Sequence, residues 1–302
     1  MAAAESRLGW TFLVICVVNY ALLWPVMRVA ALTQPPLWFG AWRMITATVA
    51  IAALLAAIGQ LRLPMRQDAG AILTVGVFMI GCYLSLAMFG LQFVGAGRAA
   101  LLGYTTPLWV TPFAVFVMGE RLNRARSAGL ALGLAGLVVL FNPLDFDWSD
   151  GEVVLGNVLL MLTAACWAIA MIYLRYYHRW NLSPLQLVPW QIGCAALVTS
   201  LAAEIVEGDQ TTVWTAQAIG LMVLAGPVLT MGGIWTANGA MRALSPITAS
   251  IGYLGAPVLA LLLGAAVLGE TLTVTLVVGF ALIIAGIVLV TLGGRPRQAS
   301  LR

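Results

Sequence analysis

The chain has 302 residues, of which 62% are hydrophobic, 31 are glycine and only 9% are charged. Soluble domains are about 45–50% apolar and about 25% charged, so this composition excludes an ordinary water-soluble globule. It also excludes a disordered chain, a collagen, a coiled coil and a disulfide scaffold; the four cysteines lie inside apolar stretches and are expected to be free. The net charge of +4 comes from scattered arginines and does not indicate a nucleic-acid partner.

Apolar runs of about 20 residues predict membrane-spanning helices. Ten such runs follow one another with short loops between them: 9–27, 37–59, 69–91, 99–118, 127–144, 153–174, 184–203, 210–236, 243–269 and 271–294. None alternates polar and apolar residues as the strands of a membrane barrel do. The expected fold class is therefore all-α, a polytopic bundle of ten transmembrane helices in a lipid bilayer.

The arginines predict the orientation, because cytoplasmic loops of membrane proteins are rich in basic residues. With the N-terminus inside, 12 of the 15 arginines fall in cytoplasmic segments and two fall outside, while Arg43 lies within a span. Eight of the 11 acidic residues fall outside. Both termini are expected to be cytoplasmic, and the first apolar run is expected to stay in the mature protein.

The two halves of the chain repeat each other at a shift of about 150 residues. Pro107 aligns with Pro257, and Gly119-Glu120 aligns with Gly269-Glu270. The predicted organisation is a first five-helix repeat over 1–144, an acidic external loop over 145–152, and a second five-helix repeat over 153–302 with a basic cytoplasmic tail. Because each repeat has an odd number of spans, the second is inverted in the membrane relative to the first. Inverted repeats are typical of secondary transporters.

This pattern resembles a known group of transporters. Ten spans in two halves, each with Gly-Glu at the end of its fourth span (Gly119-Glu120, Gly269-Glu270) before a Gly-rich fifth span, resemble the drug/metabolite transporter superfamily and its EamA-type ten-helix exporters. Pro36 followed by Arg43 on the second span fits the same group. The resemblance covers essentially the whole chain and is closest to the bacterial aromatic amino-acid exporters. It implies outward transport across a bacterial inner membrane.

Arg43 is the single ionisable residue well inside a predicted span, and such a residue is a functional candidate. It either bonds loop carbonyls and helix ends or contacts a substrate carboxylate. No Asp or Glu lies in the middle of a predicted span, so a buried carboxylate that couples a cation to protons is lacking. The expected substrates are therefore neutral or zwitterionic, with transport uncoupled from protons.

Polar and aromatic residues at mid-span predict what lines a central site. Tyrosine and tryptophan offer a flat apolar face together with a hydrogen-bond donor, which suits an indole or phenyl ring. Each of them can instead be a packing residue or face lipid. The predicted substrate-binding set is Asn19, Tyr20, Tyr83, Tyr104, Trp167, Ser250, Tyr253 and Arg43.

A membrane enzyme is the main rival, and it would need a nucleophile with a base, a metal cluster or paired acids at membrane depth. The sequence supplies none of these, so neither catalysis nor a metal or cofactor is expected. A channel would show charge rings or filter loops. The favoured function is export of aromatic and other neutral amino acids by alternating access, and the alternative is export of purines, drugs or other hydrophobic metabolites. Monomer and homodimer both stay open.

Overall fold

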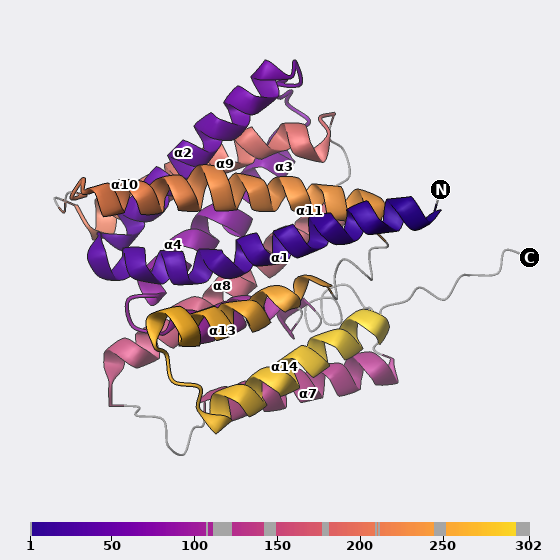
Figure 1. Ribbon diagram of the computed structural model, residues 1–302, viewed down its shortest axis with the longest axis vertical. Coiled ribbons are helices and arrows are strands. Elements are labelled where there is room, and N and C mark those ends of the chain that lie inside the picture. The colour runs from indigo at the N-terminus through magenta and orange to yellow at the C-terminus, as the bar shows by residue number, and fades with distance from the viewer. Residues whose placement is uncertain are drawn as a thin grey trace, which may run out of the picture.

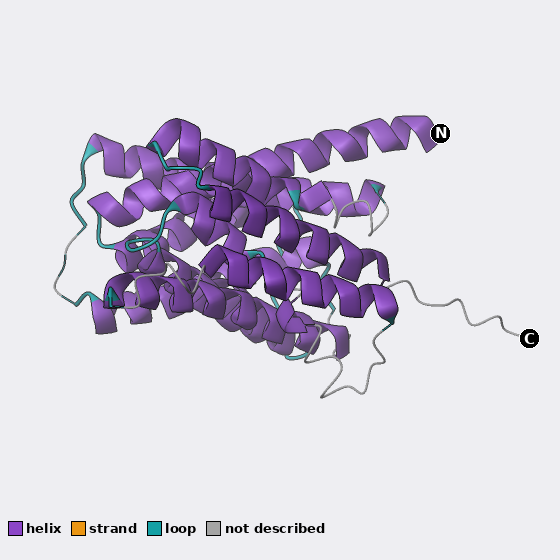
Figure 2. Ribbon diagram, turned by 90° about the horizontal axis from the view of Figure 1, so that it is seen from below, coloured by secondary structure: helices purple, strands orange, loops and turns teal. Residues whose placement is uncertain are grey.

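The computed structural model describes residues 2–106, 108–110, 123–141, 149–176, 181–208, 210, 212–244 and 252–293. All regular secondary structure in these ranges is helical (Figure 2). The elements are α1 (Ala2–Thr33), α2 (Pro36–Ala57), α3 (Ala69–Thr74), η1 (Val75–Cys82), α4 (Tyr83–Gly90), α5 (Ala96–Gly103), α7 (Arg124–Phe141), α8 (Gly151–Tyr176), α9 (Pro184–Val206), α10 (Ala216–Val223), η2 (Leu224–Thr230), α11 (Met231–Ala243), α13 (Gly255–Leu268) and α14 (Val274–Gly293). The all-α class is confirmed. The count of ten spans stays a prediction, because the fourth and ninth predicted spans fall partly outside the described ranges.

Six helical segments in these ranges are long and apolar enough to cross a membrane. They are Arg7–Thr33, Pro36–Ala57, Ala69–Gly90, Gly151–Leu174, Pro184–Val206 and Ala216–Ala240, and Ser127–Val139, Gly255–Leu268 and Val274–Val290 are shorter apolar helices. Their outer faces are apolar as well. On α9, for example, Leu197, Leu201 and Ile205 follow one another at helical spacing and are 64–82% exposed. Exposed apolar stripes of this kind are stable against lipid and unfavourable in water.

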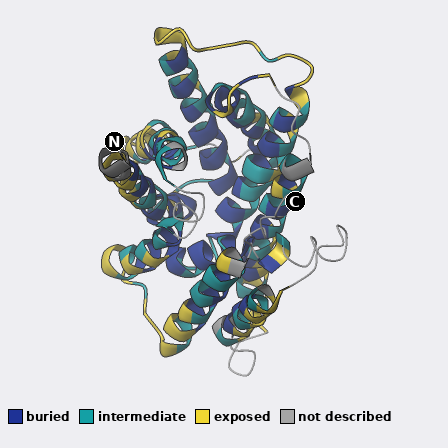
Figure 3. Cartoon of the chain, turned by 90° about the vertical axis from the view of Figure 1, so that its right-hand side faces the viewer, coloured by how far each residue is buried: buried dark blue, intermediate teal, exposed yellow. Residues whose placement is uncertain are grey.

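The long helices lie roughly along one direction, so the bundle has two ends (Figure 1). The near end is defined here as the one where α1 begins and α14 ends. The far end is the opposite one, where α1 is followed by α2 and α4 by α5. The inward-facing parts of the helices are buried (Figure 3). Large apolar side chains fill the interior between the ends, among them Phe39, Met44 and Leu101, all at most 1% exposed. All four cysteines are free, as expected.

The two halves of the chain interlock across the bundle. Helix α1 packs against α11 and α13 of the second half, and α8, which opens the second half, packs against α4 and α5 of the first. The remaining large interfaces pair α2 with α9, η1 with α9, α5 with α13 and α7 with α14. Most interfaces therefore come in pairs, in which a helix of the first half contacts a helix of the second half and the two corresponding helices contact each other in the same way. The others join two helices that correspond to each other in the repeat.

The third helix of each half is interrupted at the same place by a π-helix, η1 in the first half and η2 in the second. In each case a glycine there touches the backbone of a neighbouring helix. An ideal Cβ on Gly76 would lie 2.8 Å from the carbonyl oxygen of Gln191, and one on Gly226 would lie 2.8 Å from that of Arg43. Any side chain would push these helices apart, so glycine is required at both positions.

The fifth helices of the two halves, α7 and α14, form a close pair at one edge of the bundle (Figure 1). An ideal Cβ on Gly129 would lie 2.7 Å from the Gly286 carbonyl oxygen, and one on Gly286 would lie 2.6 Å from that of Gly129. Gly136 approaches the Gly279 carbonyl in the same way, at 2.8 Å. Small residues let membrane helices approach to backbone contact. These glycines therefore serve packing within one chain.

Two buried carboxylates fix the loops at the ends of the bundle. At the near end Asp68 accepts hydrogen bonds from the backbone amides of Asn181 (2.7 Å), Leu182 (3.1 Å) and Met65 (2.8 Å). At the far end Glu207 accepts from the amides of Leu37 and Trp38, in the first turn of α2, at 2.8 and 2.9 Å. Each carboxylate thereby joins a loop of one half to a loop or helix start of the other.

Candidate functional site

Arg43 of α2 is buried deep in the bundle, with 6% of its surface exposed. Its Nε donates a hydrogen bond to Thr230 Oγ1 at 3.0 Å, and one of its terminal nitrogens contacts Met27 Sδ at 3.0 Å. The Thr230 hydroxyl in turn donates to the carbonyl of Ala225 at 2.6 Å. The guanidinium is thus held between α1, α2 and the end of η2, and these contacts all involve neutral groups. A buried cation without a counter-charge is costly, so this arrangement favours an anionic group nearby.

Two of the predicted tyrosines lie near this cation, and a third lies beside them. The hydroxyls of Tyr20 on α1 and Tyr83 at the start of α4 both interact electrostatically with Arg43. Tyr104, which follows α5, interacts with both tyrosines. All three side chains are half-buried. The structure therefore brings together residues that are far apart in the sequence and belong to three different helices.

An aromatic wall extends the cluster towards the second half of the chain. The Trp167 ring of α8 packs edge-to-face on Tyr83, with ring centroids 5.3 Å apart and planes at 67°. Trp24 of α1 hydrogen-bonds to Tyr104 through its indole N–H. The space for these rings comes from Gly103, where an ideal Cβ would lie 2.9 Å from the Tyr83 hydroxyl and 3.0 Å from Trp24. In an edge-to-face pair the edge of one ring covers one face of the other, and the opposite face can stack with a further aromatic group.

The other predicted residues lie at the border of this cluster or outside the described ranges. Tyr253 donates a hydrogen bond to the Ala237 carbonyl at 3.0 Å and interacts electrostatically with Tyr20. Asn19 faces α11, where an ideal Cβ on Gly232 would lie 3.3 Å from its side-chain nitrogen. Ser250 lies outside the described residues. Binding by all eight remains a prediction.

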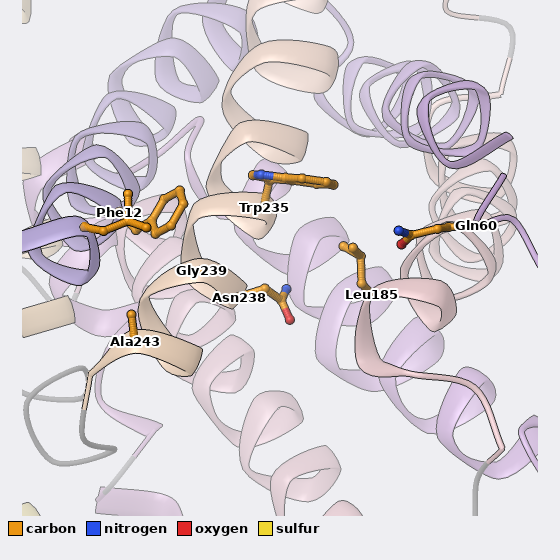
Figure 4. A pocket seen from close by; sticks show the side chains of 8 residues that line it. Phe12, Gln60, Leu185, Trp235, Asn238, Gly239 and Ala243 are labelled. Carbon is orange, nitrogen blue, oxygen red and sulfur yellow. The ribbon is translucent and has the colours of Figure 1, made fainter. Parts of the chain in front are cut away.

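A cavity of about 570 Å³ lies closer to the near end than the tyrosine cluster does. It is lined by Leu8, Phe12, Gln60, Leu185, Trp235, Asn238, Gly239 and Ala243 (Figure 4). These residues come from α1, the loop after α2, the start of α9 and α11, so the cavity lies between elements of both halves. None of them is charged, and the two rings and two amides suit a neutral or zwitterionic solute.

The cavity and the cluster are linked through α1, which contributes side chains to both, and through α11. On α11, Gly233 lies against Tyr20, since an ideal Cβ there would lie 3.0 Å from the tyrosine ring, and Trp235 lines the cavity. None of the eight residues that line the cavity is among the eight substrate-binding residues predicted from sequence. Nothing in their local pattern distinguishes them from lipid-facing or loop residues.

The family comparison agrees with this two-fold arrangement. The EamA-like transporter family matches the chain twice, over residues 7–142 and again over 154–292. The chain belongs to the EamA-like transporter family. This confirms the resemblance to EamA-type proteins, and it makes the chain a membrane transporter, as predicted, with no enzymatic role.

Several relatives match the transporter over most of its length. A protein named uncharacterized transporter YoaV, from Bacillus subtilis (strain 168), is 26% identical over 87% of this chain and 90% of its own. A probable amino-acid metabolite efflux pump from Salmonella typhimurium (strain LT2) is 26% identical over 98% of both chains. An uncharacterized inner membrane transporter, YedA of Escherichia coli (strain K12), is 27% identical over 89% of this chain and 85% of its own.

A solved crystal structure has the same overall fold. It superposes with a TM-score of 0.62 at 24% sequence identity, and the match covers 96% of this transporter and 98% of the other chain. The likeness therefore extends over the whole bundle and concerns the fold alone.

Proposed function

We propose that this transporter exports neutral amino acids, aromatic ones above all, across a bacterial inner membrane. The observation that carries the proposal is Arg43, a buried cation whose described contacts are neutral, beside a cluster of tyrosine and tryptophan side chains. An amino-acid carboxylate would supply the counter-charge, and an aromatic side chain would stack against Tyr83 and Trp167. The relatives named as amino-acid efflux pump and inner membrane transporter support the same substrate class and membrane.

Transport by alternating access fits the two-fold design. In this proposal both termini and the near end are cytoplasmic, the loop over 145–152 is external, and the two repeats rock about a substrate at the cluster. The cavity at the near end then admits substrate from the cytoplasm. In the described spans Arg43 is the central charge, and no protein carboxylate neutralises it. A substrate carboxylate can neutralise this positive charge directly, so transport does not need to be coupled to a proton.

The test is uptake of labelled amino acids into liposomes that contain the purified transporter, with no ion gradient and no other energy source. We expect saturable, mutually competing transport of tryptophan and phenylalanine and weaker transport of threonine. Tryptamine, which lacks only the carboxylate of tryptophan, should be rejected because Arg43 repels its ammonium group. Transport of tryptamine or of another organic cation in preference to tryptophan would refute the amino-acid proposal, and a requirement for a pH gradient would refute uncoupled transport.

Adenine in the same assay tests the alternative of a purine exporter. A planar purine could use the aromatic faces of Tyr83 and Trp167 but would not satisfy Arg43 with an anionic group. We therefore expect adenine to compete poorly with tryptophan.

A further inference from the structure

A single carboxylate joins two helices at the far end of the bundle. Glu270 follows α13, and its Oε1 accepts a hydrogen bond from the Ala96 amide at 2.5 Å while Oε2 accepts one from the Gly97 amide at 3.0 Å. Both amides lie in the first turn of α5, where they have no partner within the helix. The positive end of the helix dipole adds to this attraction. Glu270 therefore ties the end of α13 to the beginning of α5.

Glycines make room for this carboxylate. An ideal Cβ on Gly264 would lie 2.6 Å from Oε2, and one on Gly95 would lie 3.0 Å from the carboxyl carbon. Gly269, directly before Glu270, has φ 67°, which turns the chain back towards α5. The local sequence on both helices is thus fitted to a carboxylate at this position.

Two further contacts draw α1, α4 and α8 into the same end. The Arg28 guanidinium, near the end of α1, donates to the Leu91 carbonyl after α4 and interacts electrostatically with Glu270. Between α4 and α8, an ideal Cβ on Gly156 would lie 3.2 Å from the Gly90 carbonyl oxygen. The far end is therefore tightly closed by helices from both halves.

The near end is built from the corresponding helices but is open. Through the repeat, Gly9 corresponds to Gly156 and Gly239 to Gly90. Here Gly9 lies against the side chains of Ala243 and Leu244, and Gly239 lies against that of Phe12. Gly239 and Phe12 line the 570 Å³ cavity. The same two-fold design is thus closed at one end and open at the other.

We propose that Glu270, together with Arg28, is a latch that keeps the far end closed while the near end is open, and that each transport cycle must break it. The proposal rests on transport by alternating access. Substrate loading at the cluster would release the latch by drawing α1 and α5 towards the ligand, since Tyr20 lies on α1 and Tyr104 directly follows α5.

The sequence indicates that a latch at the opposite end would be weaker. The residue that corresponds to Glu270 is Glu120, and Ala96 and Gly97 correspond to Pro246 and Ile247; these three positions lie outside the described residues. Proline has no amide hydrogen, so an equivalent latch could form only one of the two hydrogen bonds. The unloaded transporter should therefore rest with its far end closed, ready to take up substrate at the near end.

Site-directed labelling tests the latch without any substrate. Phe93→Cys reports on the far end, because Phe93 packs against Gly156, and Ala243→Cys reports on the near-end cavity. Each is labelled with a membrane-impermeant maleimide in oriented vesicles, and labelling of the protein without the added cysteine is subtracted. In Glu270→Gln we expect far-end labelling to rise about tenfold and near-end labelling to fall, as the loss of one charge-assisted hydrogen bond predicts. Glu120→Gln should not raise far-end labelling.

The matched control is Glu204→Gln, an exposed glutamate near the far end of α9, which should leave both rates unchanged. If Glu270→Gln does not accumulate in the membrane, Arg28→Gln gives the same test, because it removes the cation from the latch. Wild-type labelling at both reporters in a folded Glu270→Gln or Arg28→Gln variant would overturn the latch. That result would not affect the proposal of amino-acid transport. Conversely, a failure to transport amino acids would not affect the conclusion drawn from the labelling.

Discussion

At the scale of single residues, the design depends on a few charged side chains, two of them buried (Arg43 and Asp68) and one half-buried (Glu270). Arg43, Glu270 and Asp68 each satisfy a need that an apolar side chain could not, and each contacts both halves or neighbouring helices. Buried charges in a membrane protein are costly unless a partner offsets them. Asp68 and Glu270 have backbone amides as partners, whereas the partners of Arg43 are a hydroxyl and a thioether. Asp68 and Glu270 are thus satisfied by the protein itself and stabilise the fold, whereas Arg43 lacks an anionic partner among its described contacts and is a candidate for binding substrate.

The first residue-scale prediction concerns Arg43. Arg43→Gln should raise the KM for tryptophan by about 10–100-fold, since a hydrogen bond to a charged group contributes about 1.5–3 kcal/mol. Arg43→Lys should recover part of this loss because it keeps the charge. The measurement is transport kinetics in liposomes, together with thermal stability in detergent. Equal loss of stability in the two variants, with no difference in KM, would show that Arg43 serves the fold alone.

The second concerns the aromatic wall. Trp167→Ala removes the ring that packs on Tyr83, so we expect a higher KM for tryptophan and phenylalanine and little change for threonine. The discrimination between aromatic and small substrates is the quantity to measure. Trp109→Ala, at an exposed position of the described chain, is the control. An equal effect of Trp167→Ala on all three substrates would argue against a ring-binding wall.

At the scale of helices, close approach is obtained by removing side chains. The α7–α14 pair and the contacts of η1 and η2 with α9 and α2 all depend on glycines that touch carbonyl oxygens. The price in conformational entropy is about 0.5–1 kcal/mol for each glycine in a helix relative to alanine. That cost is offset by the packing that these contacts allow.

Gly286→Leu tests this balance. The side chain would collide with the backbone of Gly129 and Gly133, so it should destabilise the protein by about 1–3 kcal/mol or more, as overpacking does. Thermal unfolding in detergent measures the effect. Gly220→Ala is the matched control: an ideal Cβ there meets nothing within 4 Å, and alanine favours the helix, so stability should hold or rise. Unchanged stability of Gly286→Leu would mean that the two helices are not in backbone contact.

The hydrogen bonds that Asp68 accepts from loop amides give a prediction about the pH dependence of stability. Burial tends to raise the pKa of this carboxyl, but hydrogen bonds from the amides of Met65, Leu182 and Asn181 outweigh it and hold the pKa below its usual value of 3.8. The folded state thus favours the ionised form. Its contribution to stability is fully present above about pH 4 and is lost as pH falls through the lowered pKa.

Asp68→Asn should therefore lower the melting midpoint at neutral pH by a few degrees. It should also flatten the fall in stability between neutral and acidic pH. Glu207 provides a contrast, since burial raises its pKa despite two amide hydrogen bonds, so it takes up a proton more readily than a free glutamate. If the stability of Asp68→Asn depended on pH as that of the wild type does, Asp68 would not hold these loops together.

At the scale of the whole molecule, the repeat was the most informative property of the sequence. Apolar runs and the 150-residue shift are enough for an all-helical, two-fold bundle, because lipid allows only helices or closed barrels and the runs do not alternate. The gathering of Tyr20, Tyr83, Trp167 and Arg43 was also predictable in outline, since polar groups in the membrane face the interior. Which of these groups touch one another, and at which end the cavity lies, depends on helix rotation and tilt, and hydropathy does not encode these.

The sequence also gave no sign of the π-helices or of the role of Glu270. A π-turn differs from an α-turn in hydrogen bonding and not in residue type. The Gly-Glu pair was visible as a motif, but its function depends on α5, which lies about 170 residues earlier in the chain.

The interlocking of the halves has a consequence for how such a protein is made. Since the large interfaces all join one half to the other, the first half leaves the ribosome with most of its packing surface still facing lipid. It must wait in the bilayer until the second half is inserted. Two separate genes, each encoding one half, should therefore yield little stable protein alone and restore the assembled carrier when co-expressed.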